Sequence, residues 1–145
     1  MNFDNETRRA IILDHYNAPR NKGLVKDSSY DNVHQASESC IDDLYLQLKI
    51  ENDIIVDARF DGVACAISTS STSILSELLI GKTLKDGEEL INNYENMCLG
   101  KDYDSNSLIE ANAFCELHKQ ANRIKCGLIG PNGYKRIING DKDEW

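Results

Sequence analysis

The chain has 145 residues, of which 41% are apolar, and carries a formal charge of -8 from 24 acidic and 16 basic side chains. This size fits one hydrophobic core, so we predict a single domain over residues 1–145. The negative charge disfavours nucleic acid and anionic membrane surfaces as partners. The apolar runs are too short to span a bilayer, and no signal-peptide pattern opens the chain, so we predict a cytoplasmic protein with no membrane partner.

The first sixty residues predict one helix followed by strands. Apolar spacing indicates a helix over residues 4–16, which ends before Pro19 because the residue preceding a proline avoids the helical region. A short strand is expected near residues 30–36. Apolar and polar residues then alternate over 44–50 and 54–60, with a turn at 52–53, which predicts an antiparallel hairpin. We interpret His15 as a surface or core-edge residue.

The predicted hairpin also brings together residues that flank it. Its outer ends bring the neighbourhood of residue 42 close to that of residue 62, so Cys40 and Asp42 are expected at the same edge of the sheet as Cys65. Cys65 itself precedes a Ser-rich helical pattern that ends near Gly81. The start of a helix favours a thiolate through its unpaired N–H groups and its dipole.

The second half of the chain predicts more helices. Amphipathic patterns run over 83–99 and 107–121, and Cys98 and Cys115 fall on their apolar faces, where a free cysteine acts as a small hydrophobic residue. After Cys126 we predict no continuous helix, only a short one over 134–138. The reason is a set of helix-breaking residues: Gly127, Gly130, Pro131 and Gly133.

The five cysteines are an odd set without a Cys-x-x-Cys pair, which argues against a disulfide framework. Cys126 lies beside two cations, Arg123 and Lys125, which favour the thiolate. Together with Asp42, the cysteines at 40, 65 and 126 would supply three sulfur donors and one oxygen, a set that suits tetrahedral zinc. Spacing alone leaves buried structural thiols as the alternative.

Five segments in this order resemble the SufU branch of the NifU/IscU-like iron–sulfur cluster assembly proteins. They are residues 12–23, 40–42, 60–68, 100–103 and 123–126. The SufU branch is distinguished by a longer separation between the second and third cysteines and by the lack of a histidine before the third. Here Cys65 and Cys126 are far apart in the sequence and Lys125 precedes Cys126, as in SufU.

The resemblance implies an α+β fold in which a small antiparallel three-stranded sheet packs against helices. It implies one zinc ion held by Cys40, Asp42, Cys65 and Cys126. The implied activity is that of a zinc-dependent sulfurtransferase, which accepts persulfide sulfur from a PLP-dependent, SufS-like cysteine desulfurase and passes it to a downstream iron–sulfur scaffold. By the same resemblance Cys40 is the sulfur acceptor, released from zinc when a histidine of the desulfurase takes its place.

Two alternatives remain open at this point. The same four residues could carry a labile [2Fe-2S] cluster or iron, which would make the protein a scaffold. A diverged interaction module that keeps a structural zinc and has no transfer activity is the second alternative. Ile41 and Asp43 stand where the family usually has a glycine and a basic residue.

Overall fold

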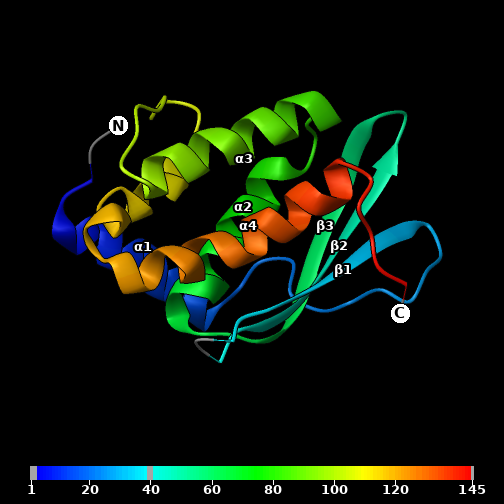
Figure 1. Cartoon of the computed structure of the whole chain (residues 1–145), viewed down its shortest axis with the longest axis horizontal. Helices are drawn as coiled ribbons and strands as arrows, with labels where there is room; N and C mark the ends of the chain where they lie inside the picture. Colours follow the sequence, from blue (N-terminus) through cyan, green and yellow to red (C-terminus); the bar gives the residue numbers. More distant parts are fainter. Residues whose placement is uncertain (1–2, 39–40, 145) are drawn as a thin grey trace.

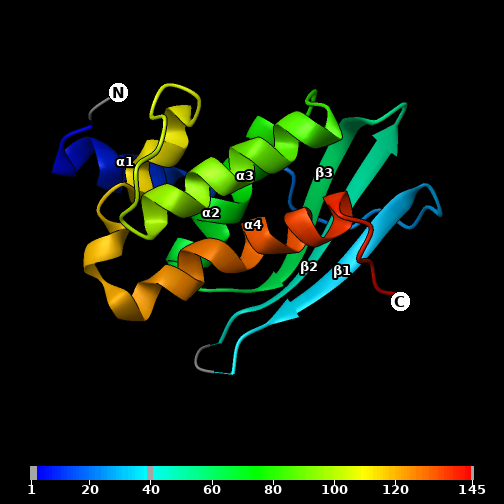
Figure 2. The ribbon, with the colours of Figure 1, turned by 45° about the horizontal axis from the view of Figure 1, so that its top comes forward.

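A computed structural model describes residues 3–38 and 41–144. The fold is α+β, as expected: helices gather on one side of a three-stranded antiparallel sheet (Figures 1 and 2). The main elements in chain order are α1 (Asn5–Asn17), β1 (Tyr30–Ala36), β2 (Asp43–Glu51), β3 (Ile54–Val63), α2 (Ala66–Leu79), α3 (Leu84–Cys98) and α4 (Ile124–Ile138).

The sheet has the order β1-β2-β3, with both pairs antiparallel. Asn52 and Asp53 have φ angles of 52° and 61°, the left-handed values that a tight hairpin turn between β2 and β3 requires. Leu44, Leu46 and Leu48 are at most 1% exposed and face the helices. The predicted hairpin and the predicted strand over residues 30–36 are confirmed.

Helices cover the apolar face of the sheet. Helix α4 packs against β1 and β2, α2 packs against β3, and α1 lies on α2 (Figure 1). On the opposite face, Gln47 is 2% exposed, and its side-chain amide bonds both the N–H and the carbonyl of Val25. This pair of hydrogen bonds holds the segment before β1 against the sheet.

Helix α2 is rich in serine and threonine and yet lies in the interior. Residues 68–76 are all buried. Most of the hydroxyl groups bond carbonyls of the preceding turn, as in Thr72 Oγ1 to Ser68 O at 2.7 Å and Ser76 Oγ to Ser73 O at 2.7 Å. Because these bonds satisfy the hydroxyls inside the helix, neighbouring elements can pack closely on every side of it.

The prediction of a broken C-terminal segment is wrong. Helix α4 runs without interruption through Pro131, and three glycines on it are the points of closest packing. A methyl group added at Gly130 would lie 1.8 Å from Thr72 Oγ1, and one at Gly133 would lie 2.6 Å from Leu46 Cδ1. The glycines therefore let α4 approach α2 and the sheet, and this packing outweighs their low helix propensity.

Proline 131 is accommodated by a side chain from α3. A proline has no N–H to donate to the carbonyl four residues earlier, which here belongs to Gly127. The Tyr94 hydroxyl donates to that carbonyl instead, at 2.9 Å, and Tyr94 is fully buried.

The predicted helix over 107–121 is also wrong in type. The segment forms three short 3₁₀-helices, η1 (Ile109–Phe114), η2 (Leu117–Lys119) and η3 (Ala121–Arg123). Ile109 has a φ of 48°, which excludes it from an α-helix, and the Asn112 amide donates to the carbonyls of Ser105 and Ile109. Leu108, Ala111 and Phe114 lie on the face that was expected to be apolar, and all three are buried. None of the helices in the described part of the chain is long and apolar enough to cross a membrane.

Candidate metal and sulfur site

The structure brings Asp42, Cys65 and Cys126 together at one end of the sheet. Each offers one donor atom, and the three atoms lie within 4.8 Å of one another. Asp42 directly precedes β2, Cys65 directly precedes α2, and Cys126 is in the first turn of α4. The fourth predicted ligand, Cys40, lies outside the described residues.

Asp42 is 2% exposed and is held by the beginning of α2. Its Oδ1 accepts the backbone N–H of Cys65 at 2.8 Å, and its Oδ2 accepts the Ser68 hydroxyl at 2.5 Å. Such bonds orient a carboxylate before it meets a metal ion, as outer-shell partners do in metal proteins. Sequence reasoning missed Ser68, although its position three residues after Cys65 matches the N-cap to N3 spacing of a helix start.

Cys65 is the N-cap residue of α2, as predicted. Its Sγ accepts the backbone N–H of Ser68 at 3.4 Å and lies 3.3 Å from the Ser68 hydroxyl. Cys126 is 3% exposed in the first turn of α4. Two helix N-termini therefore converge on the donor atoms, and their dipoles favour the negative charge of thiolates and a carboxylate.

The donor set fits a zinc ion. Bonds of about 2.3 Å to sulfur and about 2.0–2.2 Å to oxygen place the ligands of a tetrahedral zinc about 3.5–3.8 Å apart. The structure has 4.0 Å between Cys65 Sγ and Asp42 Oδ2, so a small side-chain movement would bring this pair to the separation that zinc requires. Thiolate donors also suit iron–sulfur clusters, so the donor set by itself does not choose between zinc and iron.

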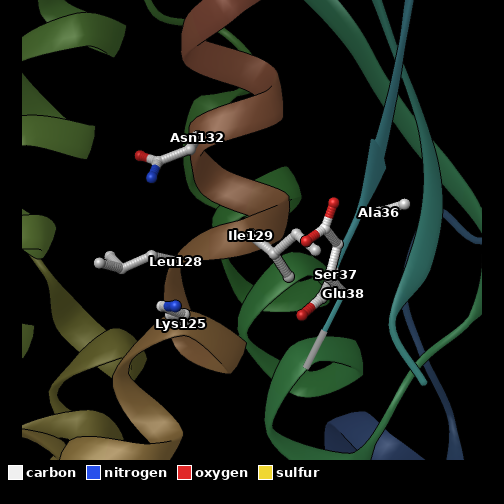
Figure 3. Close-up of a pocket in the computed structure, with 7 residues that line it drawn as sticks. All are labelled: Ala36, Ser37, Glu38, Lys125, Leu128, Ile129 and Asn132. Carbon is white, nitrogen blue, oxygen red and sulfur yellow. The ribbon is translucent and has the colours of Figure 1, made fainter. Parts of the chain in front are cut away.

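A groove of about 550 Å³ lies beside this site. It is lined from one side by Ser37 and Glu38, which follow β1, and from the other by residues of α4 that include Lys125 and Ile129. Figure 3 shows Ile129 projecting from α4 toward Ser37 and Glu38. Lys125 is exposed and directly precedes Cys126, so it places a cation at the groove.

The remaining described cysteines lie apart from the site, as predicted. Cys98 is fully buried in the core, and burial raises the pKa of its thiol to about 12. Cys115 is half-buried and packs against the core. Cys65, Cys98 and Cys115 are free thiols.

The interpretation of His15 as a surface or core-edge residue is wrong. Its side chain is completely buried, and the Ser73 hydroxyl of α2 lies 2.7 Å from its Nδ1, so this ring nitrogen has a hydrogen-bond partner in the interior. His34 is exposed at the sheet edge, where it pairs with Asp43 and stacks on Tyr45 with 4.5 Å between ring centroids. His118 is exposed.

A carboxylate and two thiols, gathered at the starts of two helices and the end of a small sheet, offer three donor atoms that could hold a metal ion. The family model of the NifU-like N-terminal domain matches residues 7–126. The chain belongs to this family.

Relatives in the family are named either as a sulfurtransferase or as scaffold proteins. The zinc-dependent sulfurtransferase SufU of Bacillus subtilis is 34% identical over 122 residues, which cover 83% of this chain and 82% of SufU. The iron–sulfur cluster assembly scaffold protein IscU of Thermotoga maritima is 29% identical over 128 residues, which cover 88% of this chain and 89% of IscU.

Solved structures show the same fold. A protein from Fervidobacterium islandicum, assigned as an iron–sulfur cluster assembly scaffold of the SUF system, superposes with a TM-score of 0.80 at 32% identity over 85% of this chain and 90% of its own. The N-terminal part of a NifU-like protein from Brucella abortus has a TM-score of 0.78 at 17% identity, covering 95% of this chain and 97% of its own.

Proposed function

We propose that this protein is a zinc-dependent sulfurtransferase of iron–sulfur cluster assembly, with Cys40 as the sulfur acceptor and Cys40, Asp42, Cys65 and Cys126 as zinc ligands. The observation that carries the proposal is that Asp42, Cys65 and Cys126 lie together at one end of the sheet. Cys40 is two residues before Asp42 in the sequence. The 34% identity with SufU over most of both chains supports zinc and sulfur transfer.

In the proposed reaction the donor is the persulfide of a PLP-dependent, SufS-like cysteine desulfurase. The Cys40 thiolate attacks the terminal sulfur of that persulfide, a new S–S bond forms on Cys40, and the desulfurase cysteine leaves as a thiolate. The step exchanges one S–S bond for another, so no oxidant or reductant is needed. A downstream iron–sulfur scaffold would then take the sulfur.

The residues of this chain have distinct parts in the proposal. Zinc would keep the cysteines deprotonated at neutral pH. Asp42 and Cys65 are fixed to the start of α2 by hydrogen bonds, so they form the immobile side of the site. In the proposal the partner's persulfide approaches along the groove between Glu38 and Lys125, where the Lys125 ammonium would attract its negative charge.

The test is stimulation of the cysteine desulfurase by the zinc-loaded protein. We expect Cys40→Ala to abolish stimulation, because no acceptor thiol remains. Cys115→Ala is the matched control: it removes a cysteine that is half-buried and apart from the site, and it should stimulate like the parent. A Cys40→Ala protein that stimulates as well as the parent would show that the acceptor is another group.

A scaffold role is the second candidate, and the 29% identity with an IscU scaffold over 88% of this chain favours it. Metal analysis of freshly purified protein separates the two. One equivalent of zinc in a colourless protein supports sulfur transfer, whereas a brown protein containing iron and sulfide would support the scaffold.

A further inference from the structure

A second group of side chains that could hold a metal ion lies far from the cysteine site. His15 of α1, Glu77 of α2 and Glu110 of η1 each offer one donor atom within 4.8 Å of the others. Glu77 is twelve residues after Cys65 along α2, which at 1.5 Å per residue is about 18 Å. This group is therefore not an outer part of the site that Cys65 belongs to.

The buried imidazole of His15 points at both carboxylates. Its Nε2 lies 3.9 Å from Glu77 Oε1 and 3.7 Å from Glu110 Oε1, too far for hydrogen bonds. The side chain is fully buried, and Nε2 has no hydrogen-bond partner among the described residues. A buried polar nitrogen without a partner is costly, so its position calls for a ligand between it and the carboxylates.

Hydrogen bonds on the other side of the ring hold it in this orientation. His15 Nδ1 lies 2.7 Å from the Ser73 hydroxyl oxygen, which also accepts the backbone N–H of Arg20 at 2.8 Å. When Nδ1 carries the proton and donates to Ser73, Nε2 presents its lone pair toward Glu77 and Glu110. Metal-binding histidines are commonly oriented by this kind of outer hydrogen bond.

The local charge also suits a dication. Arg20 is the nearby cation, and Glu77 and Glu110 help to raise the pKa of its guanidinium, although its largest contribution comes from the hydrogen bond with Asp14. The Arg20 guanidinium forms its short ion pair with Asp14, at 2.6 Å, rather than with Glu77 or Glu110.

The backbone before Glu110 is strained. Ile109 has a φ of 48°, which is a rare and strained conformation for a β-branched residue. The strained residue places the first turn of η1 beside α1 and so brings Glu110 to His15.

We propose that His15, Glu77 and Glu110 bind one divalent first-row transition-metal ion, independently of the cysteine site. Metal bonds of about 2.0–2.2 Å to nitrogen and oxygen separate neighbouring donors by about 3.0–3.4 Å. The Glu77 and Glu110 side chains are 46% and 45% exposed, so small rotations would close the observed 3.7 and 3.9 Å. One imidazole and two carboxylates favour ions such as Mn²⁺, Fe²⁺ or Zn²⁺ over the thiolate-seeking Cu⁺.

Binding can be measured with two probes on the full-length, zinc-loaded protein. Mn²⁺ avoids thiolates, so loss of the free Mn²⁺ signal in electron paramagnetic resonance reports nitrogen and oxygen sites. Equilibrium dialysis against Zn²⁺ then counts zinc beyond the first equivalent. We expect one Mn²⁺ per chain and a second zinc equivalent.

Glu77→Gln and Glu110→Gln should each weaken Mn²⁺ binding at least about tenfold, since even loss of an outer-shell partner costs about 10–100-fold. Both side chains are half-exposed, so the fold should tolerate the changes. Glu89→Gln, an exposed change on α3, is the matched control and should bind like the parent.

Three results would overturn the proposal: no Mn²⁺ binding together with a single zinc equivalent, Mn²⁺ binding that Glu77→Gln and Glu110→Gln leave unchanged, or equal weakening by Glu89→Gln. The first would mean that the two carboxylates flank His15 without a metal ion between them. Desulfurase stimulation is a separate readout, so failure here and failure of the sulfur-transfer proposal remain distinguishable.

Discussion

Asp42 has two tasks that a substitution can separate. It offers an oxygen to the proposed metal site, and it accepts the Cys65 N–H and the Ser68 hydroxyl at the start of α2. Asparagine keeps an oxygen for the Cys65 N–H and an amide for the Ser68 hydroxyl but loses the negative charge. Alanine removes both the charge and the hydrogen bonds.

We expect Asp42→Asn to lower zinc affinity at least about tenfold with little change in the free energy of unfolding of the metal-free protein. Asp42→Ala should lower zinc affinity as well and also cost about 1–3 kcal/mol of unfolding free energy, because two buried donors lose their acceptor. Competition with a chromophoric chelator and urea denaturation measure the two effects. Equal zinc affinity in Asp42→Asn and the parent would remove Asp42 from the ligand set.

At the level of elements, α4 depends on a hydrogen bond from outside the helix. The Tyr94 hydroxyl takes the place of the N–H that Pro131 lacks. Tyr94→Phe should therefore lower the free energy of unfolding by about 1–3 kcal/mol, since the buried Gly127 carbonyl loses its donor. Urea denaturation at equilibrium gives the value.

A second substitution tests this explanation. Pro131→Ala restores a backbone N–H that can bond the Gly127 carbonyl, so Tyr94→Phe should cost less in a Pro131→Ala background than in the parent. The difference between the two costs is the coupling free energy of a double-mutant cycle. Equal costs in both backgrounds would mean that Tyr94 stabilises the protein by packing alone.

Across the whole molecule, the cysteine site joins the sheet to two helices while the hydrophobic core lies elsewhere. The hydrophobic cluster includes side chains of β2, β3, α2 and α3, and none of the three donor residues belongs to it. Metal removal should therefore leave the fold in place and weaken the contact between the end of the sheet and the starts of α2 and α4. A metal ion that binds only the folded chain adds about 2.7 kcal/mol at a free concentration of 100 times its dissociation constant.

We expect chelation of zinc to lower the free energy of unfolding by at least that amount under such conditions, with the helical circular dichroism signal retained. Re-addition of zinc should restore the parent value. Loss of the helical signal on chelation would show that the metal is needed for the fold itself.

Local sequence patterns are sufficient to predict much of the secondary structure of this protein. Alternation of apolar residues predicts the β2–β3 hairpin, and helical spacing predicts α1, α2 and α3. The hairpin in turn predicts that Asp42 lies near Cys65, as the structure shows. These features depend on neighbours within a few residues, or on one tight turn, and such interactions can be read from sequence.

Tertiary contacts decided the rest. The glycines and the proline of α4 predict a broken helix, but close approach to Thr72 and Leu46 and the hydroxyl of Tyr94 stabilise a continuous one. His15 looked like an edge residue because its partners, Ser73, Glu77 and Glu110, come from elements far along the chain. The sequence by itself determined α1, the β2–β3 hairpin, α2 and α3 and supplied the donor side chains of the cysteine site. Three-dimensional packing decided the continuous α4, placed Cys126 beside Asp42 and Cys65, and buried His15 between two glutamates.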